Sequence, residues 1–280
     1  VGDIDGDGDT DIIVTSINWV GAHAEDPRKN GEILCYVNQG DGHMVVRQCG
    51  NQWGGTAVLG DMDNDGDLDL VWGSRTLDWV KDWDQWSNVP GCHNKIGNSW
   101  IKKSTCNGIF SGILYNDGKG NFNQRGFEFP DLKNSNGFTY QSTPAMAVAD
   151  LDDDGDLDVI RSHVGHLYAG AGMSIEENLG DGTFNTVFDI EFCKGPKNKG
   201  SWPTQEGSKY NCWVSDFKFA DFNNDGLIDI YLDGHDANNS DNKIVKDGAV
   251  FMSNGKFTYD ILKPSRTQYP GGFEDHDKGY

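Results

Sequence analysis

Apolar and polar residues alternate along this chain in a pattern that occurs four times. Each copy opens with nine residues that carry an acid or asparagine at positions 1, 3, 5 and 9 and glycine at position 6. A short apolar run follows directly, as in Ile12-Ile13-Val14. Short runs rich in β-branched residues favour strands over helices. We therefore expect four polar loops that each lead into a strand. The loops are 3–11, 61–69, 150–158 and 221–229.

The acidic loops have the residue types of a Ca²⁺ site. Carboxylates this close repel one another, and a hard cation with oxygen ligands removes that repulsion. Position 12, which is glutamate in an EF-hand, carries no acid in any copy, so a strand is expected there instead of a helix. The alternative is an acidic turn without metal. The residues expected to bind about four Ca²⁺ ions are Asp3, Asp5, Asp7, Asp11, Asp61, Asp63, Asp65, Asp69, Asp150, Asp152, Asp154, Asp158, Asp221, Asn223, Asp225 and Asp229.

A second motif follows each acidic loop. It is Asn-x-Gly-Asp/Lys-Gly-x-Phe/Met at 38–44, 116–122 and 178–184, and a shortened Asn254-Gly255-Lys256-Phe257. Such Asn/Asp-Gly turns between alternating residues predict β-hairpins. One repeat thus contains four antiparallel strands, which in the second repeat are expected at 56–59, 70–73, 112–115 and 122–127. Four such strands form a blade, and blades arranged around an axis form a β-propeller.

The two linked motifs together resemble the FG-GAP/VCBS repeat family, which is also represented in integrin α-subunit propellers. The resemblance covers nearly the whole chain and implies an all-β, calcium-binding β-propeller of four-stranded antiparallel blades. Four repeats are visible where the family usually has seven or eight, and the first lacks its opening strand. The tail 271–279 is similar to a fifth loop, with Lys278 in place of an acid. We expect a single propeller domain or a part-propeller over 1–280, with repeats at about 1–55, 56–143, 144–213 and 214–266.

Three insertions interrupt the repeats, at 74–108, 194–210 and 233–247. We expect them on the propeller surface, where loops carry binding function. In the first, Trp79, Trp83 and Trp86 have the spacing of one helix face. They form either the core of the insertion or a stacking platform for sugar rings. Candidate features of the other two are Trp202 and the glycosylation sequon at Asn238.

The six cysteines occur as three local pairs. The pairs are Cys35 with Cys49, Cys92 with Cys106, and Cys193 with Cys212. Local pairing is the simplest disulfide scheme. Disulfides together with Ca²⁺ loops predict an extracellular protein, secreted or on the cell surface, whereas six free thiols would fit the cytosol. No stretch is long and apolar enough to span a membrane. There is no signal peptide, and Val1 falls inside a motif, which favours a mature or partial segment.

The charge balance limits the partners. Acids outnumber bases 44 to 23, giving a net charge of −21. Four Ca²⁺ ions would reduce this charge to −13, which still disfavours nucleic acids and anionic membranes. The sequence is therefore interpreted as a non-enzymatic binding, adhesion or assembly module for a glycan, an extracellular protein or copies of itself.

An enzyme is the alternative, since some polysaccharide lyases and sugar dehydratases resemble this architecture. Its weak catalytic candidates are Arg75, His163, His166 and His235, which would have to meet in one pocket. Polar loop residues are the simpler interpretation of these four. The chain contains no G-x-S-x-G, P-loop or H-E-x-x-H motif.

Overall fold

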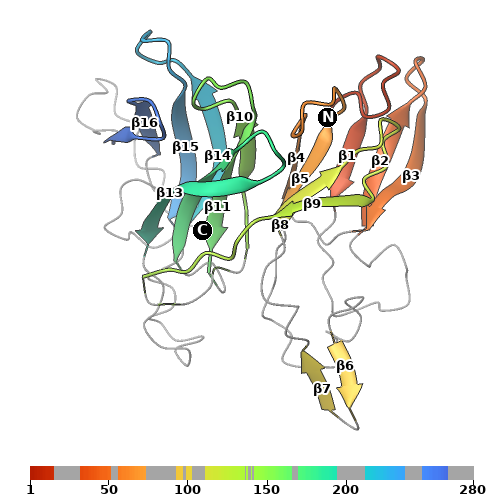
Figure 1. Cartoon of the computed structure of the whole chain (residues 1–280), viewed down its shortest axis with the longest axis horizontal. Coiled ribbons are helices and arrows are strands. Elements are labelled where there is room, and N and C mark those ends of the chain that lie inside the picture. The colour runs from red at the N-terminus through yellow and green to blue at the C-terminus, as the bar shows by residue number, and fades with distance from the viewer. Residues whose placement is uncertain are drawn as a thin grey trace, which may run out of the picture.

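The structure is a computed structural model, and its described residues form an all-β protein (Figure 1). It describes residues 1–15, 32–51, 56–73, 93–96, 99–102, 111–135, 137, 140, 142–165, 170–193, 212–236 and 248–263. Within them, no helix is long and apolar enough to cross a membrane. The strands are β1 (Ile12–Thr15), β2 (Glu32–Asn38), β3 (Met44–Asn51), β4 (Thr56–Gly60), β5 (Asp69–Gly73), β6 (His93–Ile96), β7 (Ser99–Lys102), β8 (Ser111–Tyr115), β9 (Gln124–Glu128), β10 (Met146–Ala149), β11 (Asp158–Val164), β12 (Ala171–Asn178), β13 (Phe184–Cys193), β14 (Cys212–Ala220), β15 (Asp229–Asp236), β16 (Ala249–Ser253) and β17 (Tyr259–Leu262).

The strands form one antiparallel sheet per repeat, which confirms the predicted four-stranded sheets. The second, third and fourth sheets have the orders β4-β5-β8-β9, β10-β11-β12-β13 and β14-β15-β16-β17. The first sheet is β1-β2-β3. In place of an opening strand it has a single bridge between Gly2 and Asp11. Strands β6 and β7 form a separate hairpin within the first insertion.

Consecutive sheets face each other and share an apolar core. Ile4 and Ile33 of the first sheet pack with Leu70 and Trp72 of the second, while Val71 belongs to the core between the second and third sheets. This division follows from the strand period of two, which sends Leu70 and Trp72 to one face and Val71 to the other. The largest core lies between the third and fourth sheets. The series of sheets runs from β1–β3 at one end to β14–β17 at the other (Figure 1).

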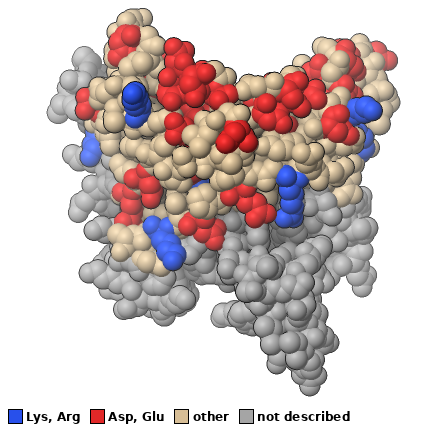
Figure 2. All heavy atoms as spheres, in the orientation of Figure 1, with Lys and Arg blue, Asp and Glu red and all other residues tan. Residues whose placement is uncertain are grey.

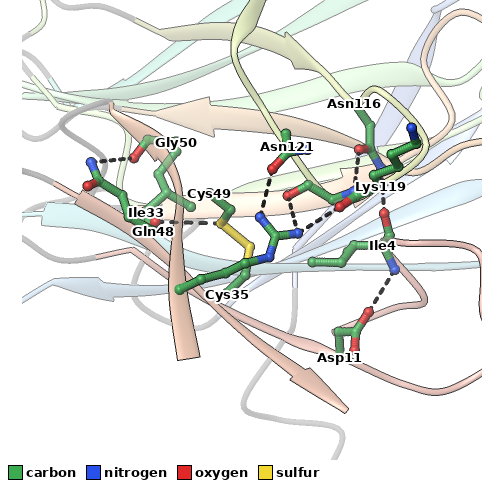
Figure 3. The surroundings of a disulfide bond; sticks show 12 residues. Ile4, Asp11, Ile33, Cys35, Gln48, Cys49, Gly50, Asn116, Lys119 and Asn121 are labelled. Carbon is green, nitrogen blue, oxygen red and sulfur yellow. Dashed lines mark hydrogen bonds between the residues drawn. A yellow bond between two sulfur atoms is a disulfide. The ribbon is translucent and has the colours of Figure 1, made fainter. Parts of the chain in front are cut away.

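Two of the three predicted disulfides are present. Cys35 and Cys49 join β2 to β3, with a Cα–Cα distance of 5.8 Å (Figure 3). Cys35 lies opposite Arg47 and the register shifts nearby, so the two cysteines bridge the strands diagonally. Cys193 and Cys212 join the end of β13 to the start of β14, and so link the third sheet to the fourth.

The third predicted disulfide, between Cys92 and Cys106, is not among the disulfides that the structure describes. Both Cys92 and Cys106 belong to the first insertion, and both lie outside the described residues. Unlike the other two pairs, the pairing of Cys106 with Cys92 therefore stays a prediction from their spacing in the sequence.

Some strand limits differ from those expected. Strand β9 begins at Gln124 instead of 122, because Phe122 is buried and its amide donates to the carbonyl of Cys49 in the first sheet. Strand β15 continues through Asp236, so the third insertion begins later than 233. Several predicted features lie outside the described residues: Trp79, Trp83, Trp86, Trp202, Asn238 and the tail 271–279.

Candidate functional site

Three of the four acidic loops bring their carboxylates together. In each, one oxygen from positions 1, 3 and 9 lies within 4.8 Å of the others. Figure 2 shows acidic side chains gathered along one edge of the molecule. The fourth loop carries Asn223 at position 3 and forms no group of three acids. The three groups are Asp3/Asp5/Asp11, Asp61/Asp63/Asp69 and Asp150/Asp152/Asp158.

The loop conformation explains two sequence positions. Position 4 has a positive φ in all four copies, with values of 59° for Asn64 and 75° for Gly6. Position 6 is a glycine with φ of 91° to 98° in three copies and 92° in the first. These left-handed values favour Gly, Asn and Asp over other residues. The carboxylate at position 1 then accepts backbone amides across the turn, as Asp61 does from Asp65 (3.1 Å) and Gly66 (3.0 Å).

The aspartate at position 9 has a role that the sequence did not indicate. In the second loop, Asp69 is 1% exposed and its Oδ2 accepts the amide of Met62 at 3.0 Å. Its Oδ1 accepts the amide of Asn116 at 2.9 Å, from the hairpin of the same sheet. Each position-9 aspartate therefore joins its own loop to its own hairpin. The same pair of bonds occurs at Asp11, Asp158 and Asp229.

The clustered acids are electrostatically unfavourable as carboxylates. Burial raises the pKa of Asp69 to about 6 and that of Asp158 to about 7, although backbone hydrogen bonds oppose both shifts. The pKa of Asp5, Asp63 and Asp152 is also raised, by burial first and then by the neighbouring loop acids. A positive charge among these groups would favour their ionised forms.

Two orphaned atoms indicate where such a charge fits. Oδ1 of Asp5 and Oδ1 of Asp152 are buried and have no hydrogen-bond partner. Both belong to position 3, and both lie in groups that offer only oxygen donors. A buried carboxylate oxygen without a partner is costly. A hard cation such as Ca²⁺, which takes six to eight oxygen ligands, matches this donor set.

The hairpin asparagines connect neighbouring repeats, which is a second role that the sequence did not indicate. Asn116 Nδ2 donates to the Leu68 carbonyl of its own loop at 3.1 Å and to the Ile4 carbonyl of the preceding loop at 2.8 Å (Figure 3). Asn178 does the same with the carbonyls of Leu157 and Met62, at 3.3 and 3.0 Å. The signal for this role was the asparagine of each hairpin motif, which we had assigned only to turn formation.

Of the four catalytic candidates, only the side chain of His163 is described. It is 3% exposed in β11, and its Nε2 lies 2.8 Å from Ser174 Oγ. Ser174 Oγ donates to Glu176, so the histidine nitrogen donates to the hydroxyl. Burial and the charge of Arg161 lower the pKa of His163 well below its usual value. Arg75 and His166, and the side chain of His235, lie outside the described residues, so their predicted meeting with His163 stays a prediction.

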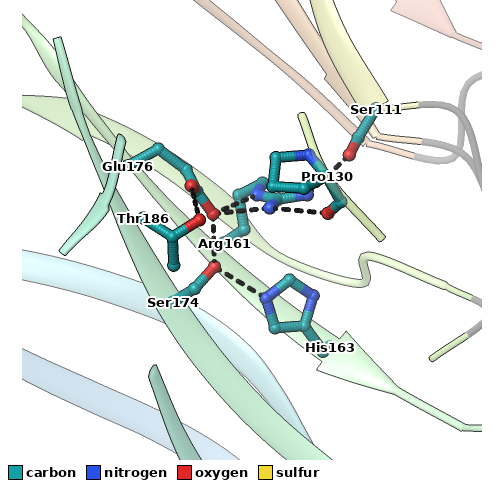
Figure 4. Close-up of polar contacts among 7 residues, drawn as sticks. All are labelled: Ser111, Pro130, Arg161, His163, Ser174, Glu176 and Thr186. Carbon is teal, nitrogen blue, oxygen red and sulfur yellow. Dashed lines mark hydrogen bonds and ion pairs between the residues drawn. The ribbon is translucent and has the colours of Figure 1, made fainter. Parts of the chain in front are cut away.

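Arg161, at position 12 of the third loop, forms the centre of a buried polar network (Figure 4). Its guanidinium contacts Glu176 Oε1 at 2.5 Å and Ser111 Oγ at 2.7 Å. Glu176 also accepts from Ser174 at 2.7 Å and from Thr186. Because Ser111 belongs to β8, this network joins the second sheet to the third.

The comparison with protein families agrees with the loop and hairpin motifs. Residues 3–72 match the model of the FG-GAP-like repeat. This segment runs from the first acidic loop, through the first sheet, to β5 after the second loop. Among curated proteins, none matches the chain. The resemblance read from the two motifs is therefore confirmed, and this is a protein with FG-GAP-like repeats.

Proposed function

We propose that the chain is an extracellular β-propeller module, stabilised by about four Ca²⁺ ions in its acidic loops, that serves in binding, adhesion or assembly. FG-GAP-like repeats and antiparallel four-stranded sheets support the propeller. The two described disulfides support an extracellular location. Candidate partners are a glycan or an extracellular protein, and the insertions 74–108, 194–210 and 233–247 are the proposed contact regions.

The observation that carries the proposal is the set of buried, orphaned oxygens within groups of three acids. Bound Ca²⁺ would supply the positive charge that these oxygens lack. The residues that would hold it are those at positions 1, 3 and 5, together with the ninth-position aspartate where its oxygens are not fully used by the backbone. Because Asp69 and its equivalents also bind the hairpin amide, binding free energy at the loop becomes folding free energy of the whole sheet.

Calcium titration followed by calorimetry and thermal unfolding tests the calcium part of this proposal. We expect the melting temperature to rise with Ca²⁺ and to fall after EDTA. One site at a hundredfold excess over its Kd adds about 2.7 kcal/mol to the unfolding free energy. Asp152→Asn should remove one equivalent of bound Ca²⁺, while the control Asp260→Asn, an exposed acid on β17, should leave the stoichiometry unchanged. A melting temperature indifferent to both Ca²⁺ and EDTA would contradict the proposal.

A glycan array probed with the labelled protein, with and without Ca²⁺, tests the binding part. We expect retention of defined glycans only in Ca²⁺, because the loops that support the binding surface need the ion. Substitution of Trp79, Trp83 and Trp86 by alanine should abolish that retention if they form the stacking platform. Turnover of an unsaturated uronide or a sugar substrate by the same preparation would instead favour the enzyme.

A further inference from the structure

The first sheet exposes apolar residues that its three sister sheets bury. In β5, β11 and β15, the first and third residues after the position-9 aspartate face the preceding sheet. They are at most 4% exposed: Leu70 and Trp72, Val159 and Arg161, Ile230 and Leu232. At the same two positions of β1, Ile12 is 38% exposed and Val14 is 39% exposed. This side of the first sheet, called the front face below, is apolar and has no neighbouring sheet within the described residues.

The fourth sheet shows the complementary defect. Position 2 of each acidic loop is covered by the hairpin of the following sheet, and Ile4, Met62 and Leu151 are at most 4% exposed. A Cβ on hairpin residue Gly120 would lie only 3.0 Å from Ile4 Cγ1, which shows how closely the hairpin covers this position. At the same position of the fourth loop, Phe222 is 49% exposed. This side of the fourth sheet is called the back face below.

The two faces also carry matching polar groups. Asn116 and Asn178 each donate to a carbonyl at position 2 of the preceding loop. Within the described residues, Asn38 of the first sheet makes only the bond to its own loop, to the Thr10 carbonyl at 3.4 Å. The carbonyl of Phe222 is the group that corresponds to the missing acceptor. The front face thus has a spare donor, and the back face has the acceptor that the internal junctions would pair with it.

Exposed apolar end faces are unusual for a stack of repeats. Terminal repeats in such stacks carry polar outer faces, which keep the ends from associating. Here the end positions carry isoleucine, valine and phenylalanine instead, and contiguous exposed apolar surface marks interaction sites. Figure 1 shows the first and fourth sheets at the two ends of the series, so one chain presents both faces at once.

We propose that the front face of one copy docks onto the back face of a second copy, in the register of the internal junctions. Phe222 of the partner copy then lies under the 38–44 hairpin, and the Asn38 amide donates to its carbonyl. The argument continues an interface already present inside the chain, and it goes beyond the proposed binding function. Because the two faces differ, the contact is heterologous, and it either closes a ring of copies or extends a chain of them.

Sedimentation equilibrium and light scattering of the full chain in Ca²⁺ test this contact. We expect a concentration-dependent mass of two or more copies. Val14→Asp on the front face and Phe222→Asp on the back face should each weaken association by at least about tenfold. Leu179→Asp is the matched control, because Leu179 is 44% exposed on the hairpin of the third sheet and belongs to neither end face. It should associate like the parent chain.

Mixing the two end-face variants gives the sharpest result. Each variant keeps one intact face, and the two intact faces are complementary, so an equimolar mixture should form a one-to-one complex although neither variant associates alone. Circular dichroism and Ca²⁺-dependent melting verify that both variants fold. Val14→Asp is independent of the calcium loops, so its effect separates docking from metal binding. A parent chain that stays monomeric at every concentration, or a mixture that does not recombine, would overturn the proposal.

Discussion

The buried pair of Arg161 and Glu176 permits a quantitative prediction about the junction of the second and third sheets. Their side chains are 3% and 0% exposed and touch at 2.5 Å. The guanidinium also lies over the ring of Phe129, at 4.8 Å from its centroid. Arg161→Met keeps the length and the apolar contact but leaves the carboxylate of Glu176 buried without its cation.

Removing one partner of a buried ion pair costs about 3–5 kcal/mol, because the other charge stays desolvated and uncompensated. We therefore expect Arg161→Met to lower the free energy of unfolding by that amount. Combining it with Glu176→Met removes the uncompensated charge. The double variant should be about 2 kcal/mol or more stable than Arg161→Met alone, because replacing both members of a buried pair by apolar groups is often close to neutral. The hydroxyls of Ser174 and Thr186 then lose an acceptor, which limits the recovery.

Urea unfolding in saturating Ca²⁺, with linear extrapolation and comparison of slopes, measures these differences. Arg125→Met is the matched control, because Arg125 and Glu128 form an exposed pair at 3.3 Å. Exposed pairs contribute about 0–1 kcal/mol. The reasoning is refuted if Arg161→Met costs no more than Arg125→Met, or if the double variant is no more stable than the single one.

Three further predictions concern other described contacts. Asn178→Ala should lower the unfolding free energy by about 1–3 kcal/mol, because it leaves two carbonyls between the second and third sheets without their donor, and Asn38→Ala should cost less in the monomer; urea unfolding compares the two. Replacing Cys35 and Cys49 by alanine should cost about 3 kcal/mol, as expected for a closed loop of about 15 residues, with thermal unfolding as the measurement. The fold keeps His163 neutral and lowers its pKa, so the unfolded chain binds the extra proton as the pH falls through about 6.5. Stability is then lost on acidification, by about 1.4 kcal/mol between pH 7.5 and 5.5. His163→Gln should remove that part of the pH dependence of urea unfolding.

The strands and loops could be predicted because their signals are local. Position 4 of each loop is Gly, Asn or Asp, position 6 is Gly, and the backbone takes left-handed values there. The apolar residues after each loop form β1, β5, β11 and β15 as expected. Even the missing opening strand of the first sheet followed from the residues before Asp3. Periods of two along a strand and positive φ in a turn depend on neighbours within a few residues.

The contacts between repeats could not be predicted in the same way. Asn116 and Ile4 are 112 residues apart, and nothing near Asn116 in sequence indicates its second acceptor. Arg161 occupies position 12, where we expected only the absence of a calcium ligand, and its partners come from β8 and β12. His163, which we considered as a catalytic residue, is buried beside that network. These roles depend on which sheets become neighbours, and sequence periodicity does not contain that information.

The asparagine link between repeats has a consequence for how much such a chain tolerates change. The amide of Asn116 or Asn178 recognises a main-chain oxygen, which every amino acid supplies. The side chain on that residue is isoleucine in one copy and methionine in the next, and the hydrogen bond is the same in both. The spacing between successive sheets is thereby held by atoms that mutation cannot alter, while the greasy filling around them is left open to drift.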